Sequence, residues 1–317
     1  MIKKLIVILL SCAVLVSINM MDRFDAKTGQ HILIIGTAKS GTTAIYKSIK
    51  DALLRAETTE GKAARLVSFF EPSAAEFQTA LRSRAKNLIV KITLIDRAAY
   101  KNLYKDIEAF DKQVMIIRDP RDILISNLLY NTRWMRFSKD PERIALFLQA
   151  IEEKEQDPSS HSLLALYQLR DKLESEVMHS WETPRSWHDE YNDYAIAVRM
   201  IDIYKDMYVL HYEDYIDEKL SGVQDYIGLN IQGNADVSSL SEQHSLKKAV
   251  ANIARSKSYD NWKNWFTVDD VKTFRPLFQP LMSKAGYTDD WALNPTPVIK
   301  AENASLYLKR IINKSRN

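Results

Sequence analysis

The sequence predicts an α/β protein in which helices flank a central parallel sheet. One observation is that helix-like segments separate the apolar runs of the chain, which is the βα alternation of a parallel sheet. Another is that a glycine-rich loop follows the first apolar run, as in α/β folds that bind anions. The apolar runs, which we expect to be strands, are residues 31–35, 66–70, 88–92, 114–117 and 207–212.

The first run, Ile32 to Ile35, leads into a Gly-x4-Gly loop from Gly36 to Gly41, and a helix-like segment follows. This is the layout of a phosphate-binding P-loop, in which backbone N–H groups and the positive end of the helix dipole face an anion. The ending is altered, because Thr42 stands where nucleoside-triphosphate enzymes have lysine and Lys39 comes three residues earlier. We therefore expect a three-layer P-loop-like fold that binds a phosphate-like group, but not an ordinary ATPase or GTPase. A turn without a ligand is the alternative.

The second run ends in a carboxylate, and the third contains a lysine. Glu71 and Pro72 directly follow residues 66–70, and Lys91 lies within residues 88–92. A glutamate at a strand end beside a proline is often only a solvated strand terminus, and the lysine has an equally plain structural interpretation. These residues alone therefore assign no function to either side chain.

An arginine follows the fourth run, at the place where ligands bind in open α/β sheets. Arg118 stands at the carboxyl end of residues 114–117, and Pro120 suits the first turn of a new helix. Ser126 then lies about two turns into that helix. A guanidinium offers a planar fork of donors to phosphate, and a serine hydroxyl can add one more. The sequence therefore predicts a second phosphate site near the first, and an arginine–aspartate network at the strand end is the alternative.

Together the two motifs resemble the sulfotransferase superfamily that uses 3′-phosphoadenosine 5′-phosphosulfate (PAPS). The loop is similar to the family's 5′-phosphosulfate loop, and Arg118 with Ser126 is similar to its 3′-phosphate motif. Tyr212, in a Tyr-Glu-Asp sequence, and Arg255, at the start of a segment with Trp-Lys-Asn, are weaker matches. The resemblance implies that PAPS is the co-substrate and PAP the product. The loop residues that it implies as cofactor ligands are Lys39, Ser40, Gly41, Thr42 and Thr43.

Three departures separate the chain from the cytosolic branch of that superfamily. Ala44 stands where that branch often has tryptophan, and the tripeptide at Arg255 reads Arg-Ser-Lys instead of Arg-Lys-Gly. That branch also places a catalytic histidine after a Lys-Thr pair, but the stretch from Val90 to Leu94 contains none. Carbohydrate sulfotransferases have a similar Glu-Pro after the first helix. The resemblance therefore implies Glu71 as the catalytic base and a closer relation to the carbohydrate-type branch than to the histidine-base branch.

The resemblance implies an enzyme, a PAPS-dependent sulfotransferase, that transfers a sulfuryl group to a hydroxyl or amine of a small-molecule or glycan acceptor. Lys39 would neutralise charge on the bridging and sulfonate oxygens, and Glu71 would take the acceptor proton. Lys91 would support the sulfonate or hold Glu71 ionised. No metal is expected, because no clear acidic partner for Mg²⁺ follows a strand. A P-loop kinase or NTPase is one alternative, and a non-catalytic PAP(S)- or glycan-binding member of the fold is another.

Composition argues against a broad nucleic-acid-binding face. The 317 residues carry a formal net charge of only +3, and 46% of them are hydrophobic, which is enough for a sizeable core. Cys12 is the only cysteine, so the folded domain cannot form an internal disulfide, which favours a reducing compartment. His161, His179 and His188 are too scattered for a metal-site pattern.

Residues 1–21 are predicted to be a separate hydrophobic segment. Lys3 and Lys4 precede an apolar stretch, residues 5–18, which suits a signal peptide, a membrane anchor or a start set too early. We expect a cytoplasmic protein that associates with a membrane through this stretch. A secretory or Golgi-type lumen is the alternative if the segment is a genuine signal-anchor.

Residues 22–317 are expected to form a single sulfotransferase domain with a helical insert at about residues 130–195. In the family, inserts at this place shape the acceptor pocket, whereas in the alternative interpretation the aromatic residues pack as a minor core. A basic stretch, residues 306–314, is predicted as a solvated or docked helix. The aromatic residues of the insert are Trp134, Trp181, Trp187 and Tyr191.

Overall fold

The computed structural model describes residues 29–59, 66–94, 103–178, 186–233, 235 and 255–316. Five strands form one sheet in the order β2-β3-β1-β4-β5, and every neighbouring pair is parallel. The predicted α/β class is therefore confirmed, and each predicted apolar run lies in a strand with only its end residues shifted. The strands are β1 (His31–Gly36), β2 (Leu66–Phe70), β3 (Asn87–Thr93), β4 (Lys112–Ile117) and β5 (Tyr208–His211).

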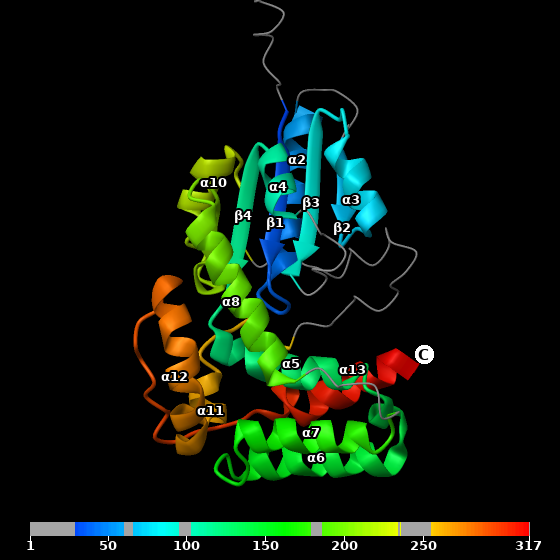
Figure 1. The fold of residues 1–317 in the computed structure, drawn as a ribbon, viewed down its shortest axis with the longest axis vertical. Coiled ribbons are helices and arrows are strands. Elements are labelled where there is room, and N and C mark those ends of the chain that lie inside the picture. The colour runs from blue at the N-terminus through cyan, green and yellow to red at the C-terminus, as the bar shows by residue number, and fades with distance from the viewer. Residues whose placement is uncertain are drawn as a thin grey trace, which may run out of the picture.

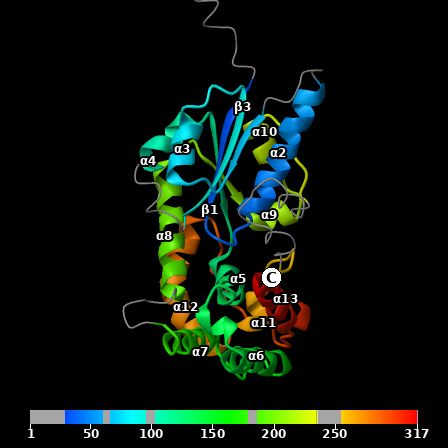
Figure 2. The same cartoon turned by 90° about the vertical axis from the view of Figure 1, so that its right-hand side faces the viewer.

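Helices cover both faces of the sheet, which gives three layers (Figure 2). In β1, Ile32 and Ile34 pack toward one layer, and Leu33 and Ile35 pack toward the other. A strand buried on both faces needs apolar side chains at every position, which explains its continuous apolar run. One face carries α2 (Thr42–Thr59), α9 (Tyr212–Ile216) and α10 (Ser221–Ile227), and the other carries α3 (Ala74–Leu81), α4 (Leu103–Asp106), η2 (Ile107–Ala109) and α8 (Trp187–Ile203).

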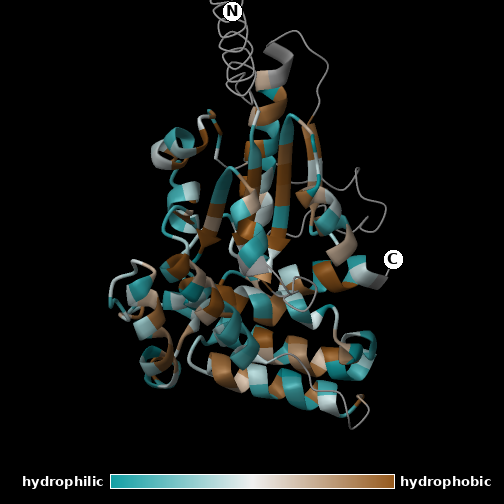
Figure 3. Cartoon of the chain, turned by 45° about the horizontal axis from the view of Figure 1, so that its top comes forward, coloured by the Kyte–Doolittle hydropathy of each residue, from teal (hydrophilic) through white to brown (hydrophobic). Residues whose placement is uncertain are grey.

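A further group of helices lies beyond the carboxyl ends of the strands (Figure 1). These helices enclose their own cluster of buried apolar side chains, and apolar residues also fill the central strands (Figure 3). The predicted C-terminal helix is present as α13, and it is docked rather than solvated, because Tyr307, Leu308 and Ile311 are buried. The group comprises α5 (Pro120–Thr132), η3 (Arg136–Lys139), α6 (Pro141–Gln156), α7 (Leu163–Ser175), α11 (Trp262–Trp265), α12 (Val268–Lys284), η5 (Ala301–Asn303) and α13 (Ser305–Arg316).

Several helices begin at residues that satisfy free backbone N–H groups. Ser73, Ser186 and Thr267 each form a capping box in front of α3, α8 and α12 respectively. Asp119 caps α5, and Pro120 occupies the first turn of that helix, as the sequence predicts. The cap stabilises the tight turn from β4 into α5, and that turn positions the predicted second phosphate site.

Some predictions concern residues outside the described ranges. The hydrophobic segment 1–21 lies there, as do His179 and Trp181. The division of the chain into an N-terminal segment and one domain therefore stays a prediction. No helix among the described residues combines the length and the hydropathy that crossing a bilayer requires.

Candidate active site

The loop between β1 and α2 is tightly built around two glycines. A Cβ at Gly36 would lie 2.6 Å from the carbonyl oxygen of Ile116 in β4, and a Cβ at Gly41 would lie 2.6 Å from the Tyr212 ring. Gly41 also has a φ of 96°, a conformation that residues with side chains rarely adopt. Only glycine fits these two positions, so the loop packs closely against β4 and Tyr212 where α2 begins.

The polar residues of this loop have two different surroundings. Ser40 is fully buried, and its hydroxyl donates to the Thr37 carbonyl at 2.8 Å, so it stabilises the turn from inside. Thr42 and Thr43 open α2, whose first N–H groups have no acceptor within the helix. The loop therefore offers backbone donors and the positive end of a helix dipole at the predicted phosphate position.

Among the residues that the structure describes, the charges that act on the Lys39 ammonium are other cations rather than carboxylates. The backbone of Lys39 is left-handed, with a φ of 65°, and its Nζ lies 3.8 Å from the centroid of the Tyr130 ring. Burial of the ammonium, followed by the charges of Arg133 and Arg118, lowers its pKa from 10.5 to about 7. The residue is still partly exposed, so a ligand can reach it from solvent. Like charges held this close together favour a bound anion.

Arg118 connects the loop to the C-terminal part of the site. Its Nη1 donates to the Lys39 carbonyl and its Nη2 to the Ser258 carbonyl, both at 3.2 Å. Its guanidinium lies 4.4 Å from the centroid of the Tyr212 ring and 3.6 Å from Asp122. Its Nε has no hydrogen-bond partner among the described residues. Arg118 therefore contacts the first loop, Tyr212 and the segment that follows Arg255.

Arg255, another predicted residue of the 3′-phosphate site, lies near Arg118. Arg255 is 8% exposed, its Nη2 has no partner among the described residues, and its Nη1 donates to the Asn303 carbonyl at 3.5 Å. Burial lowers the pKa of Arg255 to about 10, and the charge of Asp122 opposes this shift. Ser126 is buried on α5. Two arginines that are far apart in sequence thus meet beside one helix.

Asp122 is a buried carboxylate near both arginines, and no sequence motif assigned it a role. It is fully buried, accepts the Trp262 N–H at 3.1 Å and lies near both Arg118 and Arg255. Burial raises the pKa of Asp122, and the Arg118 charge opposes this shift. Asp122 lies four residues after Arg118 and four before Ser126, so the helical spacing of the motif is the signal that indicates it.

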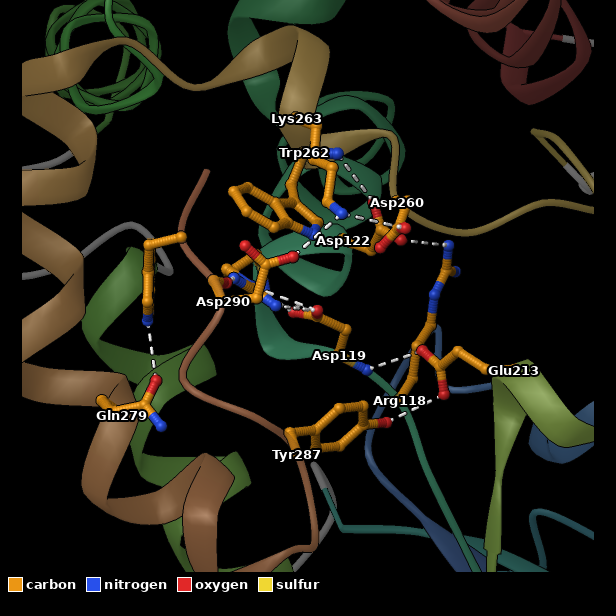
Figure 4. A network of polar contacts seen from close by, with 12 residues as sticks. Arg118, Asp119, Asp122, Glu213, Asp260, Trp262, Lys263, Gln279, Tyr287 and Asp290 are labelled. Atoms are coloured by element: carbon orange, nitrogen blue, oxygen red, sulfur yellow. Dashed lines mark hydrogen bonds and ion pairs between the residues drawn. The ribbon is translucent and has the colours of Figure 1, made fainter. Parts of the chain in front are cut away.

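The remaining charged residues of the Arg-Asp-Pro-Arg-Asp motif form a structural network (Figure 4). Asp119 pairs with Arg121 at 2.6 Å, and its N–H donates to Glu213 at 3.1 Å. The Tyr287 hydroxyl donates to the second oxygen of Glu213 at 2.9 Å. The arginine–aspartate network considered from the sequence therefore exists, and it involves both Arg121, paired with Asp119, and Arg118, paired with Asp122.

Tyr212 packs between the first loop and Arg118. The residue is 7% exposed, and its ring fills the space between Gly41 and the Arg118 guanidinium. This packing explains why an aromatic residue follows β5. Its role as a direct cofactor ligand stays a prediction.

Glu71 and Lys91 form an ion pair at the carboxyl end of the neighbouring strands. Lys91 is 1% exposed, and its Nζ donates to Glu71 Oε1 at 2.5 Å, with the Thr93 hydroxyl 3.3 Å from the same oxygen. Glu71 has a φ of 48°, and its side chain is 26% exposed. Lys91 is also one of the cations that lower the pKa of Lys39. Glu71 is therefore not a freely solvated strand end, and the pair lies within electrostatic reach of the loop.

The aromatic residues of the predicted insert have different surroundings. Trp187 packs on Phe274, and Tyr191 packs on Phe278, each with ring centroids 5.4 Å apart. These two residues contribute to a core shared with α12, as in the minor-core interpretation. Trp134, by contrast, is 61% exposed.

Two further side chains near Lys39 were not singled out from the sequence. Tyr130 contacts the Lys39 ammonium, and Arg133 is the nearby charge with the largest effect on the Lys39 pKa. They follow Ser126 by four and seven residues, which places all three on one face of the same helix. This spacing is the signal that could have identified them.

These features define a P-loop-like α/β protein with a cluster of cations between the first loop, α5 and a C-terminal segment. Residues 29–286 match the sulfotransferase domain family. The chain therefore belongs to the sulfotransferase family, which confirms the family resemblance, while the carbohydrate-type branch stays a prediction. A search of curated proteins found no match. The matched region ends before η5, although η5 supplies the Asn303 carbonyl that binds Arg255.

Replacement of Arg118 tests the predicted 3′-phosphate site. Arg118→Ala should weaken PAP binding by about 1.5–3 kcal/mol, because a charge-assisted hydrogen bond is lost. Binding of adenosine 5′-phosphosulfate, which has no 3′-phosphate, should barely change. Titration calorimetry with both ligands measures this difference, and exposed Arg199→Ala is the control. Equal weakening of both ligands would show that Arg118 only supports the loop through the Lys39 carbonyl.

Proposed function

We propose that this protein transfers a sulfuryl group from PAPS to a hydroxyl or amine of an acceptor. The observation that carries the proposal is the convergence of Lys39, Arg118 and Arg255, with Asp122 as the carboxylate between the arginines. PAPS carries anionic groups at both its 3′ and its 5′ position, so its charge complements this arrangement. Membership in the sulfotransferase family supports sulfuryl transfer, and the charge arrangement supports PAPS as the donor.

The loop residues bind the 5′ end of the donor in this proposal. Backbone N–H groups at the start of α2, together with Thr42 and Thr43, hold the 5′-phosphate, and the buried Ser40 stabilises the turn that presents them. Lys39 stabilises the negative charge that develops on the bridging and sulfonate oxygens. PAPS supplies the sulfuryl group that is transferred.

The second phosphate site orients the donor. Arg118, Ser126 and Arg255 bind the 3′-phosphate and fix the nucleotide relative to Lys39. Asp122 lies between the two arginines and limits their mutual repulsion while the site is empty. The fixed nucleotide directs the sulfuryl group toward the acceptor.

Glu71 acts as the general base that takes the acceptor proton. Its ion pair with Lys91 positions the carboxylate at the sheet edge. Its left-handed backbone supports a functional assignment, because such strained conformations cluster at functional sites. Lys91 is therefore a positioning residue for Glu71, and it adds positive charge near the sulfonate.

The acceptor that we propose is a carbohydrate, in line with the Glu-Pro that follows β2. The kinase or NTPase alternative is disfavoured, because Thr42 occupies the position of the catalytic lysine. In the described ranges, no group of three or more His, Cys, Asp or Glu side chains is placed to hold a metal ion. A mass-spectrometric screen of acceptors with PAPS tests the proposal against a non-catalytic binding protein, because turnover of any acceptor would remove that alternative.

Nucleotide binding provides the most direct test of the donor. PAP should raise the melting temperature far more than AMP or ATP with Mg²⁺, because only PAP occupies both phosphate sites. Differential scanning fluorimetry over a concentration series measures these shifts. Equal shifts from all three nucleotides would refute the two-site assignment and with it the PAPS proposal.

The lowered pKa of Lys39 makes PAP binding dependent on pH. In the ligand-free protein Lys39 has a pKa of about 7, and the negative charge of bound PAP should raise it again. Binding should therefore take up part of a proton, and affinity should fall only a few-fold as pH rises from about 7 to 9, because the backbone donors and Arg118 still bind the phosphates. Calorimetry in buffers of different ionisation enthalpy measures this uptake. Lys39→Met should abolish it, and an unchanged uptake in that variant would assign the proton to another group.

A further inference from the structure

A row of alternating cations and aromatic rings leads from the loop to the protein surface. The Lys39 Nζ lies 3.8 Å from the centroid of the Tyr130 ring, and the Arg133 Cζ lies 3.9 Å from the same centroid. Arg133 also lies 4.3 Å from the centroid of the Trp134 ring. Arg133 is 6% exposed, whereas Trp134 is 61% exposed. The row therefore begins at the proposed sulfuryl-transfer centre and ends in solvent.

Arg133 is a buried cation without a carboxylate partner among the described residues. Its Nη2 donates a hydrogen bond to the Tyr130 hydroxyl at 2.5 Å, and its Nε has no hydrogen-bond partner among the described residues. Other buried arginines differ in this respect, because Arg121 pairs with Asp119 at 2.6 Å and Arg170 pairs with Asp171. A buried guanidinium that lacks a counter-charge is costly, and an anionic ligand would offset that cost.

Arg133 has a different set of contacts from the arginines of the 3′-phosphate site. Arg118 and Arg255 are the arginines whose charges act on Asp122. Arg133 instead contacts the Tyr130 ring beside Lys39, and Tyr307 is the neighbour that it shares with Arg255. Because Lys39 and Arg133 contact one ring, their charged groups cannot be further apart than the sum of their two distances to its centroid. Arg133 is thus a neighbour of Lys39 on the side that leads to Trp134.

We propose that Arg133 and Trp134 bind the acceptor, and that the acceptor is an acidic sugar. Arg133 pairs with a carboxylate or sulfate substituent, because its planar fork matches the oxygens of such groups. Trp134 offers an exposed indole face on which a sugar ring can stack. Since Arg133 is close to Lys39, the anionic substituent lies on the sugar that receives the sulfuryl group or on the adjacent one. This inference rests on the proposed function and names the substrate class of the same site.

The test compares a chondroitin oligosaccharide with its carboxyl-reduced form, which has the same rings but no carboxylates. Binding is measured by calorimetry on the full chain saturated with PAP. The wild-type protein should bind the acidic form at least about tenfold more tightly, as expected for a charge-assisted bidentate pair. Arg133→Gln should lose this preference, and Arg133→Lys should retain part of it. Trp134→Ala should weaken both forms by a similar factor.

Controls separate acceptor binding from donor binding and from folding. PAP affinity and melting temperature should stay close to the wild-type values in Trp134→Ala, and PAP affinity should change by less than about threefold in Arg133→Gln. Arg199→Gln removes an exposed arginine from α8 and should change neither sugar preference nor PAP affinity.

Three results would overturn the inference. A wild-type protein that binds both forms equally, or neither, does not recognise an acidic sugar. An Arg133→Gln variant that loses PAP affinity more than about tenfold while keeping its sugar preference would make Arg133 a donor ligand. Failure of PAP to bind the wild-type protein at all would instead refute the proposed function, so the two failures are distinguishable.

Discussion

Glu71→Gln should lower kcat by about 10²–10⁴, the range for loss of a general base. Gln preserves the shape of the side chain but cannot accept the proton of the acceptor. PAP affinity should stay within a few-fold of the wild-type value, because Glu71 faces the acceptor rather than the nucleotide in the proposed mechanism. Steady-state kinetics with any acceptor from the mass-spectrometric screen, together with PAP titration, measures both quantities.

The ion pair with Lys91 complicates this substitution, because Glu71→Gln leaves the Lys91 ammonium buried without its counter-charge. A double variant, Glu71→Gln with Lys91→Met, removes both charges and should recover much of the lost thermal stability. It should not recover kcat if Glu71 is the base. The exposed residue Glu108 provides the matched control, because Glu108→Gln should alter neither stability nor rate. Near-full activity in the double variant would place the base elsewhere.

Lys39→Met should lower kcat by about 10²–10³, the range for loss of one preorganised charge donor in the transition state. The variant keeps the apolar stem of the side chain but removes the ammonium that contacts the Tyr130 ring. Most of the loss should appear in kcat rather than in PAP affinity, because the backbone donors and Arg118 still bind the phosphates. Lys205→Met, at an exposed position before β5, is the matched control. A larger loss in PAP affinity than in kcat would make Lys39 a binding residue.

The same variant, which should lower kcat, should also make the ligand-free protein more stable. The pKa of Lys39 is lower in the folded protein than the ordinary value of 10.5, so folding disfavours the charged form. This destabilisation is complete below pH 7 and declines as pH rises from 7 toward 10.5. Lys39→Met should therefore raise the melting temperature of the ligand-free protein, and by more at pH 6 than at pH 9. A buried charged side chain that lowers the stability of the folded protein is typical of catalytic centres.

The central strands β1, β3 and β4 could be predicted because a strand buried on both faces must be apolar throughout. The run from Ile32 to Ile35 shows this pattern, and its residues pack alternately toward the two helical layers. The docking of α13 was not decided by the sequence, because its basic residues suit a solvated helix equally well. Burial of Tyr307 against the rest of the fold distinguishes the two interpretations.

The candidate site could be predicted only where its residues are close in sequence. The glycines of the first loop and the position of Arg118 after a strand are local signals, and the structure brings them together through the pairing of β1 with β4. Asp122 and Arg133 were missed because a charged residue on a helix is usually solvated. Both side chains are buried by helices and segments that lie elsewhere in the chain, and this burial is the evidence that they belong to the site.

The sequence by itself determined the strands, the glycine-rich loop after β1 and the family, because these follow from apolar periodicity and from short motifs. Only the tertiary structure decided which side chains share an environment. Parallel pairing of β2 with β3 places Phe70 opposite Lys91, and this register brings the next residue, Glu71, to the lysine. Electrostatic interactions act over distances in space, so the pKa of Lys39 and the counter-charge of each arginine are properties of the fold rather than of any motif.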